Sequence, residues 1–462
     1  MALQFRVQGL GKIEDAEINI SPLTVITGPN GTGKSFFTKM IYSIFRMIED
    51  ISLLEVISER CKKLESVYSK AEIDESTENL SSIKHCLDIS RRLDNEISNM
   101  ATIKINEVEK IERLSNIINE FEPHIEIYKD SEDSGLNLSF SNVNKESSMH
   151  KESIEFMESI TLYIVSFLTS FSTGYEVLLA YDLEDEIKEN FQIESIKELI
   201  NRDSEKIEIS LEGLFNISFN DSTTISIPPE SINFFKDKPN SIFFESPAYW
   251  RVRDALVDAK LKSGDNYLSG VPKYFFDLDS DLRKKSKIES ELLPIHEKIK
   301  SNLLGEFIFE SGNISFEDDE LGRKISKNLV SFGMTNLGMV NALIKNNVIK
   351  KGSYVFIDEP ETNLHPDWQV LMIQSLVSLS KAGVNVIITT HSTEILKYIE
   401  VSFTKLKEEE GGEKVKELLS VNFLDTDGTS WDFDSACPID QTKEALAELS
   451  SSFMNLYMGK FQ

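Results

Sequence analysis

The chain has 462 residues, and its 49 basic and 77 acidic side chains give a formal net charge of −28. A field of this sign repels polyanions, so DNA is disfavoured as a strong ligand of the chain alone. A local basic groove stays an alternative, because residues 251–287 concentrate positive charge. The longest apolar run, 160–171, is shorter than the roughly 20 residues of a membrane span and predicts a buried helix instead.

The first residues contain no secretory signal, and three scattered cysteines, Cys61, Cys86 and Cys437, match neither a disulfide framework nor a zinc site. We therefore expect a cytoplasmic protein without a membrane partner. The length predicts two or three domains, or one large domain with an insertion.

Residues 1–48 are predicted to form the N-terminal part of an α/β domain, which is called the head below. An alternating pattern at 5–20 predicts strands, and the apolar run 23–27 predicts a buried strand. The glycine-rich stretch "GPNGTGKS" follows at 28–35 and leads into apolar residues at helical spacing.

Residues 49–240 are predicted to form a mainly helical insertion. Apolar residues recur at steps of three and four within 52–68, whereas the polar stretch 129–148 interrupts the helical pattern. Alternation between 206 and 229 predicts a small antiparallel element at the end of this insertion.

Residues 241–400 are predicted to complete the head. A strand begins this part, helices follow to about 304, and a hairpin is expected to turn at Ser311 and Gly312. A helix, the buried strand 353–359, an amphipathic helix ending at Gly383 and a second buried strand come next. The tail 401–462 is expected to hold an acidic loop at 407–414, a hairpin around 425–433 and a closing helix.

The stretch 28–35 fits the phosphate-binding pattern G-x-x-x-x-G-K-S, between a predicted strand and a predicted helix. Its glycines permit backbone N–H groups to point at phosphate oxygens, Lys34 can bridge the β- and γ-phosphates, and Ser35 can ligate Mg²⁺. The pattern predicts ATP and Mg²⁺ as cofactors. The expected nucleotide-binding residues are Gly28, Pro29, Asn30, Gly31, Thr32, Gly33, Lys34, Ser35 and Phe36.

Two acids, Asp358 and Glu359, end the buried strand 353–359. In a P-loop protein such acids hold Mg²⁺ through water and deprotonate the attacking water, so Asp358 is the expected metal residue and Glu359 the expected base. Surface acids in salt bridges are the alternative.

His391 ends the next predicted strand, where its imidazole can contact the γ-phosphate. A structural histidine is the alternative, which the strand–helix–strand spacing disfavours.

Three motifs in one order, "GPNGTGKS", "IDEPETNLHP" and "TTHS", resemble ABC-type ATPases of the SMC and DNA-repair class. The sequence is most similar to the ATPase part of the OLD nucleases and to stand-alone relatives in antiphage systems such as Septu and PARIS. The resemblance covers roughly the first 45 residues and 325–395. It implies an α/β fold, namely a P-loop ABC-type head with a mixed sheet flanked by helices and a large helical insertion.

The resemblance also implies that two heads sandwich ATP, as a homodimer or a higher homo-oligomer, and that a signature segment from one head faces the nucleotide of the other. The stretch "VSFGMTNL" stands where that signature belongs and assigns its serine and glycine to Ser331 and Gly333, with Phe332 at a position where the fuller motif has glycine. A helix N-cap at Ser331 is the alternative. The glutamine that links the nucleotide to the helical lobe in this family is not placed.

The C-terminal Toprim domain of the family's nucleases has no counterpart in the tail, where "DTDG" at 425–428 is predicted to be a turn. We therefore expect an ATPase that serves as sensor or scaffold of an antiphage complex and controls a separately encoded effector such as a nuclease. A DNA-repair or chromosome-maintenance ATPase of the SMC class and a self-contained OLD-like nuclease are the alternatives.

Overall fold

The computed structural model describes residues 3–50, 81–100, 107–120, 125–129, 136–140, 171–220, 223–227, 240–245, 248–263, 270–283, 287–310 and 313–451, with parts of 57–65, residue 268 and residues 457–458. The chain divides into two compact units. Unit 1 contains Met1–Glu49, Tyr181–Ser226 and Phe235–Gln462, and unit 2 contains Asp50–Ala180 and Ile227–Phe234. The expected insertion, 49–240, differs from this division because the segment 181–226 belongs to unit 1.

A parallel five-stranded sheet forms the centre of unit 1, with the order β15-β3-β14-β13-β9. Its strands are β3 (Leu23–Thr27), β9 (Ser241–Phe244), β13 (Tyr354–Asp358), β14 (Asn385–Thr390) and β15 (Leu419–Phe423). These strands are almost completely buried, as expected where helices cover both faces of a parallel sheet. Thr27 lies opposite Thr390, and Asp358 lies opposite Thr389, so the carboxyl ends of the three middle strands meet at one edge.

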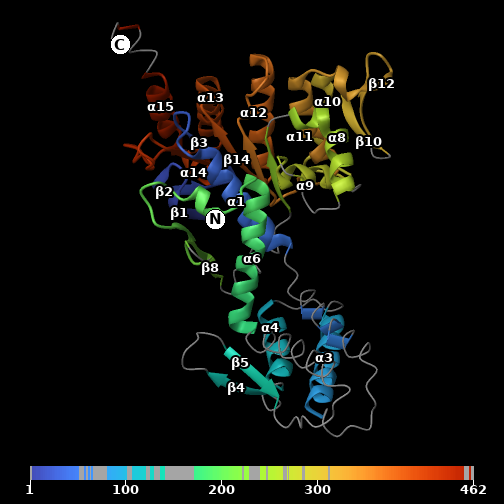
Figure 1. The fold of residues 1–462 in the computed structure, drawn as a ribbon. Helices are drawn as coiled ribbons and strands as arrows, with labels where there is room; N and C mark the ends of the chain where they lie inside the picture. The colour runs from blue at the N-terminus through green and yellow to red at the C-terminus, as the bar shows by residue number, and fades with distance from the viewer. Residues whose placement is uncertain are drawn as a thin grey trace. The chain divides into compact units, whose positions relative to one another are not determined.

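Helices cover the sheet on both sides (Figure 1). They include α1 (Lys34–Asp50), α12 (Pro366–Lys381), α13 (Thr393–Glu410) and α15 (Pro438–Leu449). Helix α12 packs on β14 and β3, and α15 packs on β15 and α13. In Figure 1, α11 (Phe332–Lys345), α12, α13 and α15 stand in a row on one side of β3 and β14, and α1 lies on the other.

A second, antiparallel sheet of unit 1 has the order β2-β1-β6-β7-β8. Its strands are β1 (Leu3–Leu10), β2 (Ile13–Ile20), β6 (Ile207–Leu211), β7 (Phe215–Phe219) and β8 (Thr223–Ser226). The expectation that the 206–229 element ends the helical insertion is wrong, because β6 pairs with β1. Phe5 of β1 contacts Phe37 and Phe45 of α1, while Phe45 also contacts Phe356 of the central sheet. Helix α1 is therefore held between the two sheets.

The remainder of unit 1 contains the helices α8 (Ala248–Ser263), α9 (Lys273–Asp281), α10 (Leu293–Leu303), α11 (Phe332–Lys345) and α14 (Gly412–Leu418) and the short 3-10 helices η3 (Ile196–Leu199) and η4 (Lys327–Leu329). A third sheet contains β10 (Gly305–Glu310), β11 (Asn313–Asp318) and β12 (Arg323–Ser326). The two strands of the expected hairpin are β10 and β11, whereas its turn, Ser311 and Gly312, lies outside the described residues.

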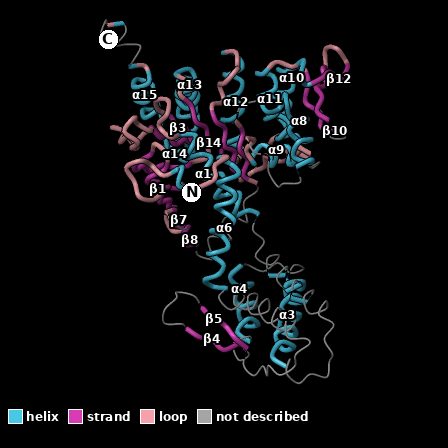
Figure 2. Tube along the Cα trace, viewed as in Figure 1, coloured by secondary structure: helices cyan, strands magenta, loops and turns pink. Residues whose placement is uncertain are grey.

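In unit 2 the structure describes α3 (Ser81–Met100), α4 (Glu107–Ile118) and a two-stranded ribbon of β4 (Ile125–Lys129) and β5 (Leu136–Phe140). Helix α6 (Phe171–Phe191) begins in unit 2 and ends in unit 1. Figure 2 distinguishes these helices and strands by colour. Most of the helix expected at 52–68, and the run 160–171 apart from its last residue, lie outside the described residues. Within the described ranges, no helix combines the length and the apolar character that a bilayer crossing requires.

The tail differs from its prediction in two respects. The expected acidic loop, 407–414, is helical except at Gly411, which ends α13 and precedes α14. Strand β15 was not predicted, yet it forms an edge of the central sheet beside β3. The turn at 425–428 is confirmed by the bonds from Gly428 N to Asp425 O and from Asp425 N to Thr429 O, at 3.1 and 3.0 Å, and the closing helix is α15.

Candidate nucleotide-binding site

The loop between β3 and α1 has backbone conformations that require glycine. Gly28, Gly31 and Gly33 have φ angles of 139°, 78° and 98°. A Cβ atom on Gly28 would lie 2.1 Å from Leu424 O, and one on Gly33 would lie 2.7 Å from Ile13 Cγ1. The loop therefore keeps its close path only with glycine at these positions, as a phosphate cradle before a helix N-terminus demands.

Lys34 is buried at the start of α1, with only 7% of its surface exposed. Its Nζ donates hydrogen bonds to Gly28 O and Pro29 O, at 2.9 and 2.7 Å, so the side chain folds back along the loop. Burial lowers the pKa of Lys34, and the negative charges of Glu359, Asp358 and Glu361 oppose that shift. The ammonium group is thus held in the loop by carbonyl oxygens that a phosphate group can replace.

Asp358 connects the phosphate-binding loop to the ends of two strands. Ser35 Oγ donates to Asp358 Oδ1 at 2.9 Å, and Thr389 Oγ1 donates to the same oxygen. Burial raises the pKa of Asp358, while the hydrogen bonds from Thr389 and Ser35 oppose the rise. A hydroxyl and a carboxylate are oxygen ligands of the kind that Mg²⁺ prefers, so the predicted metal residues, Ser35 and Asp358, lie together.

Glu359 and His391 are brought together at the same edge of the sheet. His391 Nδ1 lies 3.1 Å from Glu359 Oε1, and Thr362 Oγ1 donates to Glu359 Oε2 at 3.3 Å. Glu359 has a φ angle of 50°, which is uncommon for a residue with a side chain. Its N–H donates to Thr389 O at 3.1 Å. The two side chains are 41% and 42% exposed, so both of them reach solvent.

A cavity of about 610 Å³ opens above the loop. Its lining includes the 30–36 part of the loop, Glu359, the β1–β2 turn at Gly11 and Lys12, and the 3-10 segment near Glu198 and Ile200. The loop and the expected base thus face one space. Phe36, 38% exposed, lies at this cavity and packs edge-on against Phe191 of α6, with ring centroids 5.5 Å apart.

The signature-like segment lies apart from this cavity lining. Ser331 is the N-cap of α11 and its Oγ accepts a hydrogen bond from Met334 N at 3.2 Å, so the helix-cap interpretation is confirmed. Ser331 is nevertheless exposed, whereas Gly333 is buried. A Cβ atom on Gly333 would lie 2.9 Å from Asn363 O, in the loop that follows Glu359. The glycine thus allows the start of α11 to pack against that loop.

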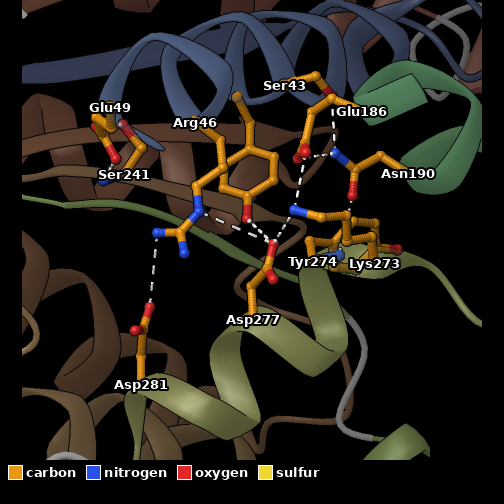
Figure 3. A network of polar contacts seen from close by, with 11 residues as sticks. Ser43, Arg46, Glu49, Glu186, Asn190, Ser241, Lys273, Tyr274, Asp277 and Asp281 are labelled. Carbon is orange, nitrogen blue, oxygen red and sulfur yellow. Dashed lines mark hydrogen bonds and ion pairs between the residues drawn. The ribbon is translucent and has the colours of Figure 1, made fainter. Parts of the chain in front are cut away.

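A network of polar contacts anchors α1 to α6, α9 and β9 (Figure 3). Asn190 of α6 donates to Ser43 Oγ and Glu186 Oε1, each at 2.9 Å, and accepts from Tyr274 N at 2.9 Å. Lys273 Nζ lies 2.8 Å from Glu186 Oε2 and 3.0 Å from Asp277 Oδ2. Burial raises the pKa of Glu186, whereas the two carboxylates outweigh burial and raise the pKa of Lys273.

The sequence did not identify Glu245, which directly follows β9. Its carboxylate lies 3.2 Å from Lys39 Nζ and accepts a hydrogen bond from Tyr274 Oη. Its negative charge also contributes to the raised pKa of Asp358. No motif marks this residue; only the parallel pairing of β9 with β13 brings it to the site edge. Through Tyr274 it joins the network around Asn190, while its charge acts on Asp358.

These features define a P-loop nucleotide-binding protein with an α/β head, as the motifs predict. A family model described as "AAA ATPase domain" matches residues 1–396, and the chain belongs to this family. The Old nuclease of Escherichia phage P2 is 31% identical over 144 residues, which are 29% of this chain and 24% of that protein. This confirms the likeness of the sequence to OLD-type ATPases; the chain spans about a quarter of the length of that curated relative.

Solved structures that match the chain include the SMC head domain from Thermotoga maritima, at 11% identity and a TM-score of 0.32, with 86% of this chain and 92% of that chain covered. The ADP conformation of MJ1267, an ATP-binding cassette of an ABC transporter, matches at 12% identity and a TM-score of 0.33, with 99% of each chain covered.

Proposed function

We propose that the protein is a Mg²⁺-dependent ATPase whose heads pair around ATP and whose nucleotide state controls a separately encoded effector of an antiphage complex. One observation carries the proposal of ATPase activity. Four residues lie together at one edge of the sheet, namely Lys34, Ser35, Asp358 and Glu359, although 323 positions separate Ser35 from Asp358. Membership of the AAA ATPase domain family supports it.

Each residue has a role that its position allows. The loop amides and Lys34 bind the phosphates, and Ser35 and Asp358 hold the metal ion, which supplies positive charge to phosphate oxygens when it is bound. Glu359 takes a proton from the attacking water, and His391 orients Glu359 through the 3.1 Å contact.

ATP binding is tested directly with Lys34→Ala. The change removes the ammonium group and leaves the loop glycines intact, so the folded variant should lose at least about 100-fold in ATP affinity by calorimetry. Lys443→Ala, at an exposed position of α15, is the matched control. Unchanged ATP affinity in a folded Lys34→Ala chain would remove the phosphate cradle from the proposal.

Pairing of heads is tested by complementation. The exposure of Ser331 at the start of α11 supports a role toward a second head, and Ser331→Arg would place bulk and charge there. A mixture of Lys34→Ala and Ser331→Arg chains can form one intact composite site per dimer, so it should hydrolyse ATP faster than either variant alone. A mixture that stays as inactive as its components argues against a shared site.

Control of an effector is supported by the similarity to the Old nuclease and by the net charge of −28, which disfavours unaided DNA binding. Pull-down from the native host with wild type and Glu359→Gln, followed by mass spectrometry and a nuclease assay, should identify a protein that prefers one nucleotide state.

The similarity to the Old nuclease also supports the second candidate, a self-contained nuclease. Cleavage of DNA by the purified chain, lost on substitution of its own residues, would decide for that candidate.

A further inference from the structure

Three consecutive residues, the last two of β14 and His391 directly after it, each pair with one carboxylate: Asp358, which ends β13, or Glu359 or Glu361, which follow it. Thr389 donates to Asp358, Thr390 Oγ1 donates to Glu361 Oε1 at 2.6 Å, and His391 Nδ1 lies 3.1 Å from Glu359 Oε1. Two of these pairs involve residues with a proposed role: Asp358 toward the metal ion and Glu359 as the base. The pair of Glu361 and Thr390 has no role in the chemistry described above.

Thr390 is completely buried, and its hydroxyl makes two hydrogen bonds. It donates to Glu361 and accepts from Ser392 N at 3.0 Å. Residues on both sides of His391 are thereby fixed through one hydroxyl group. The imidazole of His391 is 41% exposed, so its position depends strongly on the backbone at 390–392.

Glu361 carries a carboxyl group whose charged form is disfavoured by its surroundings. Burial raises the pKa of its carboxyl group, and its second oxygen, Oε2, is buried without a hydrogen-bond partner among the described residues. A carboxylate that only filled space would be better replaced by an apolar side chain. An unfavourable group of this kind beside a catalytic edge indicates a functional requirement.

We propose that Glu361 is a positioning residue, which acts through the Thr390 hydroxyl to hold His391 against the Glu359 carboxylate. This inference rests on the proposed ATPase function and adds a residue to its machinery. Glu361 touches neither nucleotide nor water in this role. It fixes the geometry of the contact that orients the base.

The test compares Glu361→Ala, Glu361→Gln and Thr390→Val with the matched control Thr442→Val. Thr442 is also completely buried, and its hydroxyl donates to Pro438 O at 2.7 Å in α15, away from the site. Misplacement of a reacting group by about 1 Å costs up to ~100-fold in rate, so kcat of Glu361→Ala and Thr390→Val should fall about 10- to 100-fold. ATP affinity should stay within about twofold of wild type, because the Thr390 hydroxyl bonds to Glu361 and Ser392 and neither side chain forms a hydrogen bond with residues 28–36.

Glu361→Gln provides the rescue, because its amide oxygen still accepts the Thr390 hydrogen bond. It should keep kcat within about threefold of wild type. Two results would overturn the inference: Glu361→Gln as slow as Glu361→Ala, which would assign the effect to the charge, or Thr390→Val as fast as Thr442→Val.

A spectroscopic measurement keeps the test independent of turnover. The His391 imidazole resonance, assigned by its loss in His391→Gln, should move in Glu361→Ala and Thr390→Val and stay in place in Thr442→Val. An unmoved resonance would contradict the inference even in an inactive protein. An inactive wild type with the expected resonance shifts would instead contradict the proposed ATPase function alone.

Discussion

Ser35 donates a hydrogen bond of 2.9 Å to Asp358, across 323 positions of the chain. Ser35 stands at the start of α1 and Asp358 at the end of β13, so the bond joins the phosphate-binding loop to the opposite wall of the site. Asp358 accepts a second bond from Thr389 of β14. Three elements of the head are thus aligned by one carboxylate oxygen.

Asp358→Asn should separate the structural role of this carboxylate from its role toward the metal. The amide oxygen can still accept from Ser35 and Thr389, but the negative charge is lost. We expect the Mg²⁺ concentration for half-maximal ATPase activity to rise by at least about 10-fold, since a charged oxygen ligand of the cation becomes neutral. A titration of activity with Mg²⁺ measures this, and an unchanged midpoint would show that the metal lies elsewhere.

Glu359→Gln keeps the shape of the side chain and removes the base. Turnover should fall about 100-fold or more while ATP affinity is retained, because proton transfer contributes to the transition state and not to binding. Light scattering with ATP should show a dimer that persists longer than in wild type. Glu413→Gln, exposed on α14, controls for the loss of one charge. A variant with wild-type turnover would exclude Glu359 as the base.

Gly28→Ala should be more damaging than Gly31→Ala. Both residues have positive φ angles, but a Cβ on Gly28 would meet Leu424 O at 2.1 Å, whereas nothing lies within 4 Å of one on Gly31. We expect Gly31→Ala to cost about 1 kcal/mol from backbone strain alone and Gly28→Ala at least about twice as much. Urea unfolding of both variants measures the difference, and equal costs would contradict the close approach of the loop to Leu424.

Asn190→Ala should destabilise the contact between α1 and α6. Its side chain makes three hydrogen bonds, each of 2.9 Å, and its loss leaves Tyr274 N–H without its acceptor in a buried place. A cost of about 2–3 kcal/mol is expected from the unsatisfied buried groups. Asn302→Ala, at an exposed position of α10, is the matched control. Equal unfolding midpoints for the two variants would show that the network contributes little.

The stability effect of Glu361→Gln should depend on pH. Burial raises the pKa of Glu361, so the folded state binds its proton more tightly than the unfolded state does. Its stabilising contribution is present below the unfolded pKa and is lost as pH rises through the folded pKa. The variant should therefore gain stability relative to wild type in mildly alkaline buffer and less in mildly acidic buffer. Glu205→Gln, at an exposed position, should show no such difference in unfolding midpoints.

The sequence predicts those residues of the site that belong to a recognisable motif at the end of an apolar strand. The loop 28–35, the acids after β13 and the histidine after β14 each follow an apolar strand, and parallel pairing must bring such strand ends together. Glu245 follows a strand too, but a single acid without a motif carries no signal of its own. Its place beside Lys39 depends on which strand β9 joins.

One error concerns the partner of a predicted strand, and two concern elements of the tail. The alternation at 206–229 was recognised, but the pairing of β6 with β1 is a contact between residues about 200 positions apart, which alternation does not encode. In the tail, apolar residues at Ile395, Ile399, Phe403 and Leu406 mark α13, and only the glycine pair at 411–412 suggested a loop. Strand β15 is five residues long and mixes polar with apolar side chains, so the sequence pattern does not predict it. It is buried because it pairs with β3.

The central sheet places β3 between β14 and β15. The P-loop strand is made among the first 27 residues, yet its two neighbours are completed only at Thr390 and Phe423. A ribosome that adds about 5–20 residues per second needs roughly 20–80 s to supply these later strands. A nascent chain therefore carries the P-loop sequence during this whole interval without the sheet that shapes it, and it should acquire nucleotide only after Phe423 has been made.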